Sequence, residues 1–295
     1  MAVINVPGAD ADDFVLPRRF SLLTAIRRNP TIALGGVLLL ALVLMAVLAP
    51  VIATADPFKI APVNRLRPPS ERWWFGTDQF GRDVFSRTVY GARVSLIVGL
   101  SVAVVSSVLG LALGLACGYF RRLDGLVMRV MDGVMAIPSI LLAIALITLT
   151  RPGLGIVIVA IVIPEVPRIV RVVRSVVLSI RAQPYIESAI AGGTRNLKLL
   201  LRHVLPNTLA PLIVQSTYVC ASAMLIEAGL SFLGAGVPPE VPSWGNIIAQ
   251  GRTFFQIAPW TILIPGAFLA VTVLAVNLLG DGLRDRLDPR LARRL

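Results

Sequence analysis

Long apolar segments alternate with polar stretches along this chain, and their lengths indicate membrane-spanning helices. A helix needs about 20 apolar residues to cross a bilayer, and several runs here reach that length. The apolar segments lie at residues 31–54, 94–119, 126–149, 154–173, 208–233 and 260–279. The pattern predicts an all-α polytopic membrane protein with six transmembrane helices.

Two long polar stretches stand between these segments. The first, residues 55–92, is predicted to be a loop that ends in a short interfacial helix, in which Asp83 and Arg87 have the i,i+4 spacing of a helical ion pair. The second, residues 183–207, divides two very apolar segments. The predicted organisation is a tail at 1–30, a first transmembrane helix at 31–54, the loop at 55–92, a five-helix core at 93–281, and a tail at 282–295.

The stretch 183–207 has the signals of two helices with a glycine joint between them. Pro184 suits the first turn of a helix, because its missing N–H has no partner to lose there. Gly192 and Gly193 then end that helix, since glycine accepts the left-handed conformation. Thr194 is predicted to cap a second helix through its hydroxyl. The apolar residues of the second helix recur at helical spacing on one face: Leu197, Leu200, Leu201 and Val204.

Composition and charge agree with a membrane protein and exclude several other classes. The chain has 295 residues, of which 56% are hydrophobic, and a mean hydropathy of +0.81. A net charge of +12 would suggest nucleic-acid binding in a soluble protein, but here positive residues serve as topology signals. Cys117 and Cys220 lie inside apolar runs, which argues against a disulfide framework or a metal site.

The distribution of Lys and Arg predicts the orientation in the membrane. Six spans place both termini on the same side. That side carries eighteen Lys and Arg residues against nine on the other, so both termini and residues 183–207 are predicted to face the cytoplasm. All four tryptophans then fall on the outer side, where an interfacial aromatic belt is expected: Trp73, Trp74, Trp244 and Trp260.

Small residues inside the predicted spans indicate where helices pack closely, and charged residues there are candidates for lining a translocation path. Gly110, Gly114 and Gly118 repeat every four residues, a spacing that lets two helix backbones approach closely in a membrane. Glu165 and Glu227 lie within predicted spans, and such charges usually face a bundle interior or a water path. Both are therefore candidates for lining a translocation path. Prolines are expected to kink spans 3, 4 and 6: Pro138, Pro164, Pro167 and Pro265.

The polar stretch before the fifth span also carries a recognisable motif. Its residues read E-S-A at 187–189, then Gly193, then H-V-L-P at 203–206. This spacing resembles the E-A-A loop of ABC importer permeases, with Ser188 where alanine is usual and His203 where isoleucine is usual. In that family the loop is a cytoplasmic coupling helix that docks into a cleft on the ATPase subunit. The coupling residues that the resemblance implies are Glu187, Ser188, Ala189, Gly193, His203, Leu205 and Pro206.

Motifs elsewhere narrow the resemblance to one branch of the family. Residues 76–87 read GTDQFGRDVFSR and residues 90–96 read YGARVSL. They are similar to the second, C-type permease subunit of dipeptide, oligopeptide and nickel importers. The matching segments further along are GLSFLG at 229–234, PSWG at 242–245 and NLLGDGLRD at 277–285. The resemblance covers the chain from about residue 20 to its end.

The resemblance implies a fold, partners and a location. The fold is that of a type I ABC importer permease with a cytoplasmic coupling helix, in a bacterial inner membrane. The implied partners are a homologous permease subunit, two ABC ATPase subunits that hold ATP and Mg, an extracytoplasmic solute-binding protein and membrane lipid; nucleic acid is not among them. The chain itself is not expected to be an enzyme or to hold a cofactor, because neither Lys59 nor Lys198, its only lysines, stands in a phosphate-binding loop.

Several alternatives remain open. The same machinery could carry nickel chelates, opines or other small solutes instead of di- or oligopeptides. A proton-coupled secondary transporter would use Glu165 or Glu227 for protons, but such proteins often contain repeated halves, and none is visible here. A membrane-bound enzyme would need clustered acids, bases or metal ligands. Residues 183–207 could also be an amphipathic connector that rests on lipid headgroups.

Overall fold

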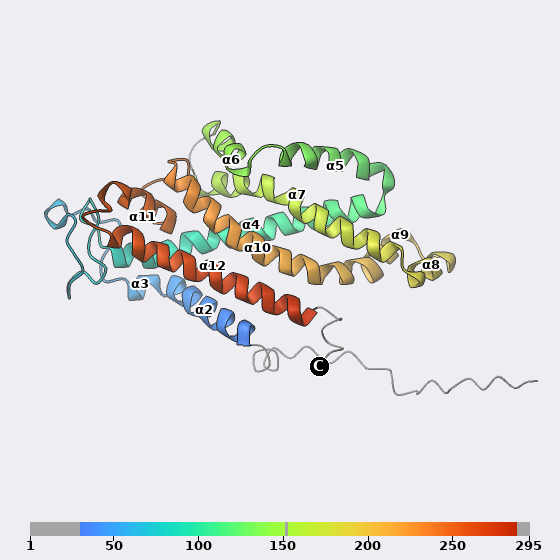
Figure 1. Cartoon of the computed structure of the whole chain (residues 1–295), viewed down its shortest axis with the longest axis horizontal. Coiled ribbons are helices and arrows are strands. Elements are labelled where there is room, and N and C mark those ends of the chain that lie inside the picture. The colour runs from blue at the N-terminus through green and yellow to red at the C-terminus, as the bar shows by residue number, and fades with distance from the viewer. Residues whose placement is uncertain (1–29, 151–152, 288–295) are drawn as a thin grey trace, which may run out of the picture.

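The chain folds into a long bundle of helices, and the computed structural model describes residues 30–150 and 153–287 (Figure 1). The predicted all-α fold is confirmed for these residues. The transmembrane and longer helices are α2 (Pro30–Val47), α4 (Val84–Tyr119), α5 (Arg121–Met135), α6 (Ser139–Thr148), α7 (Leu154–Arg181), α10 (Leu205–Phe232) and α12 (Trp260–Leu287). The short elements are α3 (Ala49–Ile52), the 3₁₀ turns Pro62–Asn64 and Arg252–Phe254, α8 (Pro184–Ala191), α9 (Asn196–Leu199), the π-helix Leu200–Val204 and α11 (Trp244–Gly251).

The predicted spans correspond to these helices, with two qualifications. Among the described residues, four helical stretches are long and apolar enough to cross a membrane: α2, α4, residues 196–232 and the α12 segment up to Arg286. The α5–α6 pair makes a fifth candidate, but it bends by 86° at the break that contains Pro138. The helix at the predicted fourth span, α7, carries Glu165, Arg168 and Arg171 in its first 18 residues. Its charge therefore sets it apart from the apolar spans.

Among the described residues, α4 and α7 form the most extensive helix–helix contact, and the glycine repeat explains how close they come. A Cβ built on Gly110 would fall 2.5 Å from Cγ2 of Ile169, and one on Gly118 would fall 2.6 Å from the Cβ of Val177. Only glycine lets the two helices lie this close. Small residues at this spacing maximise van der Waals contact between helices, which must drive association where lipid is as apolar as the side chains. The predicted close packing is confirmed.

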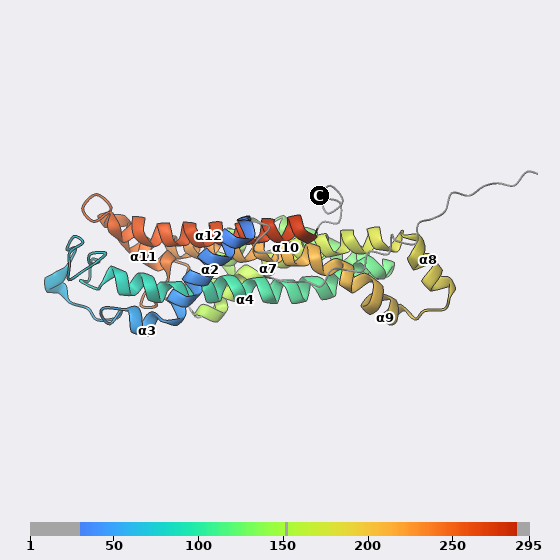
Figure 2. The same cartoon turned by 90° about the horizontal axis from the view of Figure 1, so that it is seen from below.

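The two ends of the bundle differ. The loop at residues 55–83, α11 and the start of α12 gather at one end, and α8 and α9 form a tip at the other (Figures 1 and 2). The helix α2 lies at the edge of the bundle beside α12 (Figure 1). A Cβ on Gly282 of α12 would fall 2.3 Å from Cγ1 of Ile32, so the end of α12 lies against the start of α2. The tip is therefore carried by α7 and α10, away from α2.

The loop at residues 55–83 differs from the prediction in its last turn. The residues expected in a separate interfacial helix are the first turn of α4, which begins at Val84. Asp83 caps this helix by accepting the Ser86 N–H at 2.9 Å. Arg87 lies 3.8 Å from Asp78 instead of pairing with Asp83. The prediction of an i,i+4 ion pair is wrong. Asp83 is the N-cap residue of α4, where its carboxylate accepts a hydrogen bond from a backbone N–H that has no partner within the helix.

The tryptophans lie at the loop end of the bundle, but one of them is not interfacial. The Trp244 side chain is fully buried, and its Nε1–H donates to the Thr88 carbonyl at 2.9 Å. Trp74, in contrast, is 56% exposed. The prediction of a belt formed by all four tryptophans is therefore wrong for Trp244, which instead packs α11 against α4.

Candidate functional site

The candidate coupling site is the tip made by α8, α9 and the π-helix. Pro184 occupies the first turn of α8, as the sequence predicts. The helix ends at Gly192, and Gly193 follows with φ of +75°. The Gly193 N–H donates to Ile190 O at 2.9 Å and the Thr194 N–H donates to Ala189 O at 3.0 Å. These two bonds form a Schellman motif, so the joint has a defined geometry.

The second helix of the tip departs from the prediction in its cap and its face. Its N-cap is Arg195, with no side-chain cap bond, rather than Thr194. Leu199 and Val204 are fully buried, whereas Leu197 is 68% exposed. The buried pair is five residues apart, because residues 200–204 form a π-helix, and a π-helix bonds i to i+5. The predicted apolar face at 197, 200, 201 and 204 assumed an α-helical period and is wrong.

The tip is anchored to the long helices by buried and polar contacts. Ile186 of α8 and Leu199 of α9 are fully buried in the main hydrophobic core. The Arg181 guanidinium donates to the Tyr119 carbonyl at 2.9 Å, which joins the ends of α7 and α4. The Tyr119 hydroxyl in turn donates to Asn196 Oδ1 at 2.6 Å. Buried side chains and hydrogen bonds therefore join the tip to the ends of α7 and α4.

The predicted coupling residues gather at this tip in two groups. Glu187, Ser188 and Gly193 are exposed on α8 and its end. The second group stands where the chain enters α10, with Pro206 exposed. The two groups meet through ring contact between Tyr185 and His203, whose centroids are 6.3 Å apart. The remaining members are less exposed: Ala189, His203 and Leu205.

Four large apolar side chains of the tip are also exposed, and the sequence analysis did not assign them to the site. They are Tyr185, Ile190, Leu197 and Leu201, with exposed fractions between 47% and 68%. Exposed apolar side chains gathered in one place mark an interaction surface. The sequence did contain a signal for them, because apolar residues in a polar stretch between two spans have no core of their own to fill. We call these four residues with Glu187 the tip surface.

The two buried carboxylates predicted for a translocation path have different surroundings. Glu165 on α7 is fully buried, and its Oε1 lies 3.1 Å from Nη1 of Arg168, whose side chain is 37% exposed. Glu227 on α10 is also fully buried. Its Oε1 accepts the hydroxyls of Ser231 and Ser243, each at 2.9 Å. Glu227 thus joins α10 to the start of α11. Glu165 instead forms an ion pair with Arg168, whose side chain reaches the surface of the bundle.

Two further ion pairs link α5 to α7, and the sequence analysis did not predict them. Arg174 contacts both carboxylate oxygens of Asp124, with Nη2 to Oδ2 at 2.6 Å. Arg171 Nη2 lies 2.7 Å from Oδ1 of Asp132. The Arg171 and Asp132 side chains are both about half exposed, so this second pair adds little stability. These pairs explain why α7 retains arginines along the face toward α5.

The described residues contain no group of three or more His, Cys, Asp or Glu side chains that could hold a metal ion. The site residues at the tip are the Glu187 carboxylate, the Ser188 hydroxyl, which donates to the Pro184 carbonyl at 3.0 Å, the His203 ring, apolar side chains and glycine. This arrangement is suited to binding a protein surface.

Sequence comparison gives matches over most of the chain. The family described as "Binding-protein-dependent transport system inner membrane component" matches residues 106–293, and "N-terminal TM domain of oligopeptide transport permease C" matches residues 22–69. A probable peptide ABC transporter permease protein of Sinorhizobium fredii is 60% identical over 268 residues, covering 91% of this chain and 92% of that protein. A dipeptide transport system permease protein of Alkalihalophilus pseudofirmus is 43% identical, covering 90% and 88%.

One further relative and one solved structure extend the comparison. An oligopeptide transport system permease protein of Bacillus subtilis is 35% identical over 268 residues, covering 90% of this chain and 88% of that protein. Among solved structures, the inward-facing MetNI methionine ABC transporter matches with a TM-score of 0.58 and 20% identity. That match covers 68% of this chain and 96% of the other. It shows a shared type I importer permease fold.

Proposed function

This chain belongs to the family of binding-protein-dependent transport system inner membrane components, and we propose that it is the permease subunit through which an ABC importer takes up di- or oligopeptides. The family fixes the class of protein: a multi-pass inner-membrane permease that works with ATPase, permease and solute-binding partners and is not itself the ATPase. The peptide substrate is the proposed part. Relatives from three organisms that are named for peptide, dipeptide or oligopeptide transport align with 90% or more of this chain.

The tip surface is the proposed contact with the ATPase, and its exposure is the observation that carries the coupling proposal. Tyr185, Ile190, Leu197 and Leu201 present apolar area around the acidic Glu187. Helical peptides docked into a groove typically offer such apolar anchors, while nearby charge selects the partner. Arg195, Lys198 and Arg202 are also exposed at the tip, and an amphipathic connector on lipid would carry basic and apolar residues in the same way. A direct contact with the ATPase is what separates the proposal from that alternative.

The anchoring of the tip suggests how the motion is transmitted. ATP closes the ATPase dimer and draws two such tips together, one from each permease subunit. Because Ile186 and Leu199 are buried in the core, and Arg181 ties α7 to the end of α4, the pull reaches both helices. The close packing of α4 and α7 then makes them move as one body, which opens the path toward the binding protein.

Glu165 and Glu227 are the proposed charged residues of the translocation path, and the geometry favours Glu165. Its partner Arg168 is partly exposed on α7, so the pair can meet a polar substrate or water. The Glu227 carboxylate is enclosed by Ser231 and Ser243 and holds α11 in place. The two carboxylates are therefore proposed to differ in role.

The orientation is proposed from the charge count: both termini and the tip face the cytoplasm, and residues 55–83 face outward. The same orientation puts the tip within reach of cytoplasmic ATPases. It also puts the loop end, with α11, within reach of an extracytoplasmic binding protein. The finer composition, with one homologous permease and two ATPases, follows from the resemblance to this branch.

Uptake by the assembled transporter tests the substrate proposal. The chain, its permease and ATPase partners and the binding protein are reconstituted in vesicles with ATP inside, and labelled di-, tri- and pentapeptides are supplied outside. We expect ATP-dependent uptake of peptides and ATPase activity stimulated by peptide-loaded binding protein. A binding protein that carries a nickel chelate or an opine, with no peptide uptake, would overturn the substrate while leaving the permease class intact.

A further inference from the structure

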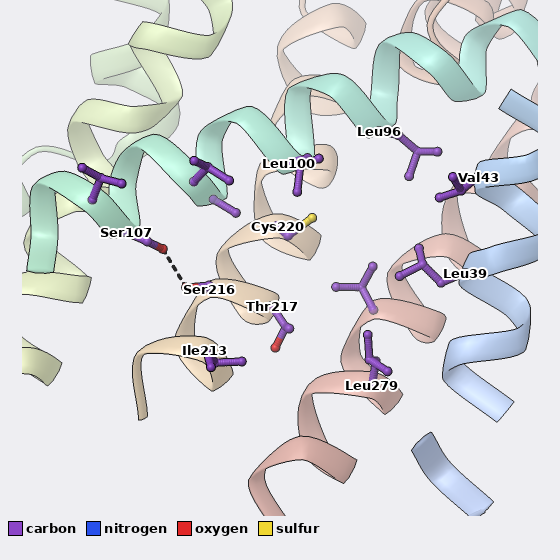
Figure 3. A pocket seen from close by; sticks show the side chains of 14 residues that line it. Leu39, Val43, Leu96, Leu100, Ser107, Ile213, Ser216, Thr217, Cys220 and Leu279 are labelled. Atoms are coloured by element: carbon purple, nitrogen blue, oxygen red, sulfur yellow. Dashed lines mark hydrogen bonds between the residues drawn. The ribbon is translucent and has the colours of Figure 1, made fainter. Parts of the chain in front are cut away.

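An apolar groove of about 460 Å³ lies between four helices: α2, α4, α10 and α12 (Figure 3). Leu39 and Val43 of α2 face Leu100 of α4 across it, and Ile213 of α10 and Leu279 of α12 complete the wall. This volume is in the range of small-molecule sites, which is roughly 300–1,000 Å³. Neither the coupling tip nor the path candidates belong to it.

The groove exists because α2 contacts α12 near its start and α4 near its end. Near its start, a Cβ on Gly35 would fall 2.8 Å from the Ala275 carbonyl oxygen, so α2 lies directly on α12. Near its end, α2 is held to α4, since the Arg93 guanidinium donates to the carbonyls of Ala46 and Val47. Between these contacts α2 diverges from α4, and their apolar side chains line the groove instead of meeting.

The chemistry of the walls selects an apolar ligand. The hydroxyls of Ser107 and Ser216 are hydrogen-bonded to each other at 2.6 Å, and the Thr217 hydroxyl donates to Val214 O at 2.8 Å. These polar atoms are already paired. A peptide placed here would leave its backbone groups without partners, which costs several kcal/mol per group. A hydrocarbon chain has no polar groups, so it would lose no hydrogen bonds in the groove.

The length of the groove matches that of an acyl chain. All four walls belong to helical stretches long and apolar enough to cross a membrane. Along α4 the groove runs from Leu96 to Val108, a rise of about 18 Å at 1.5 Å per residue. Half of a bilayer's hydrocarbon core is about 15 Å. One acyl chain of a phospholipid therefore has the right length, and acyl chains are the solvent that surrounds membrane-spanning helices.

A cation stands at the outer end of the groove. Arg93 lies one turn before Leu96 on α4 and binds α2 just beyond Val43. Its two observed hydrogen bonds go to carbonyls, and across residues 30–150 and 153–287 no carboxylate forms an ion pair with it. Arginine presents five N–H donors in a fork that suits phosphate, so Arg93 can also receive a headgroup.

We propose that this groove binds one acyl chain of an anionic phospholipid, whose phosphate is held by Arg93, and that the lipid joins α2 to the core helices. The acyl chain fills the space that the side chains of α2 and α4 leave open. The phosphate offsets the positive charge of Arg93 at the end of the groove.

Photocrosslinking of the assembled transporter tests the site. The probe is phosphatidylglycerol with a diazirine midway along one acyl chain, in nanodiscs of phosphatidylcholine. We expect labelling of α4 and α10 residues in the groove. Val104→Trp, which fills the groove from α4, should reduce this labelling severalfold. Val105→Trp is the matched control, because Val105 is exposed on the same helix but does not line the groove.

A second variant and a second probe keep the test decisive. Ile213→Trp fills the groove from α10, so the result does not depend on one variant folding. Arg93→Gln should remove the preference for phosphatidylglycerol over the matching phosphatidylcholine probe, and Arg93→Lys should retain most of it. Unchanged labelling in both tryptophan variants would overturn the acyl-chain site. A crosslink from a cysteine at 104 to a partner subunit, with no lipid label, would assign the groove to a protein interface instead.

Discussion

The backbone of α4 at Gly114 lies against the side chain of Val173 on α7, since a Cβ on Gly114 would fall 2.6 Å from the Cβ of Val173. Gly114→Leu should therefore force the two helices apart. Overpacking of this kind costs about 1–3 kcal/mol. We expect a lower apparent Tm and a smaller yield of assembled transporter, measured by thermal unfolding of the detergent-purified complex.

Gly125 provides the control for this substitution. It lies on α5, where a Cβ would meet nothing within 4 Å. Gly125→Ala should change the apparent Tm little or raise it, because alanine favours helix. If Gly114→Leu unfolds at the same temperature as the unmodified protein, the close contact between α4 and α7 does not contribute to stability.

The features that the sequence predicted correctly rest on local or periodic signals. The four-residue glycine repeat in α4 led to a close helix partner, and Pro184 with Gly193 led to a helix and its end. Both depend on what a residue type permits in the backbone, whichever helix packs nearby. The partner itself, α7, was not predictable, because the repeat does not say which side chain fills the approach.

The features that the sequence missed depend on hydrogen-bond competition and on long-range placement. The face of the second tip helix was misassigned because residues 200–204 adopt a π-helix, which shifts Leu197 outward. Asp83 was paired with Arg87 by spacing, but it caps α4 instead. The apolar groove could not be predicted, because it arises from how α2 crosses α4 and α12. The groove depends on tertiary packing, whereas at Asp83 one local interaction displaced another.

The joint at Gly193 gives the second prediction. Its φ of +75° is the left-handed region, where a β-branched residue costs about 1–3 kcal/mol. Gly193→Val should distort the Schellman motif and turn α9 away from α8. We expect membrane insertion to be retained, while peptide uptake and peptide-stimulated ATPase activity both fall severalfold.

Two variants separate backbone strain at this joint from steric blockage. Asparagine tolerates the left-handed region, so Gly193→Asn should restore much of the coupling. Gly192→Ala, at an adjacent residue with φ of −75°, should behave like the unmodified protein. Full coupling in Gly193→Val would show that the joint geometry is not needed for contact with the ATPase.

The orientation gives the third prediction. Ser70 is exposed in the loop at residues 55–83, which we propose faces outward. Ser70→Cys, in a background with Cys117→Ala and Cys220→Ala, should therefore react with a membrane-impermeant maleimide applied to intact spheroplasts. Ser188→Cys at the tip is the matched position at the other end and should react only after permeabilisation. The measurement is mass-tagging on a gel. The reverse pattern would invert the topology and place the tip away from the ATPases.

The two buried carboxylates give the last prediction. Glu227→Gln keeps an oxygen for the hydroxyls of Ser231 and Ser243, so this variant should fold and transport nearly normally. Glu227→Ala leaves two buried donors unpaired at about 1–3 kcal/mol each, and should lower the apparent Tm and loosen α11. Glu165→Gln should instead keep its stability and reduce uptake, because the charge that faces Arg168 is lost from the proposed path. Measuring Tm and uptake together separates these outcomes.

Normal uptake in Glu165→Gln with lost uptake in a stable Glu227→Gln would reverse the assignment and make Glu227 the path residue.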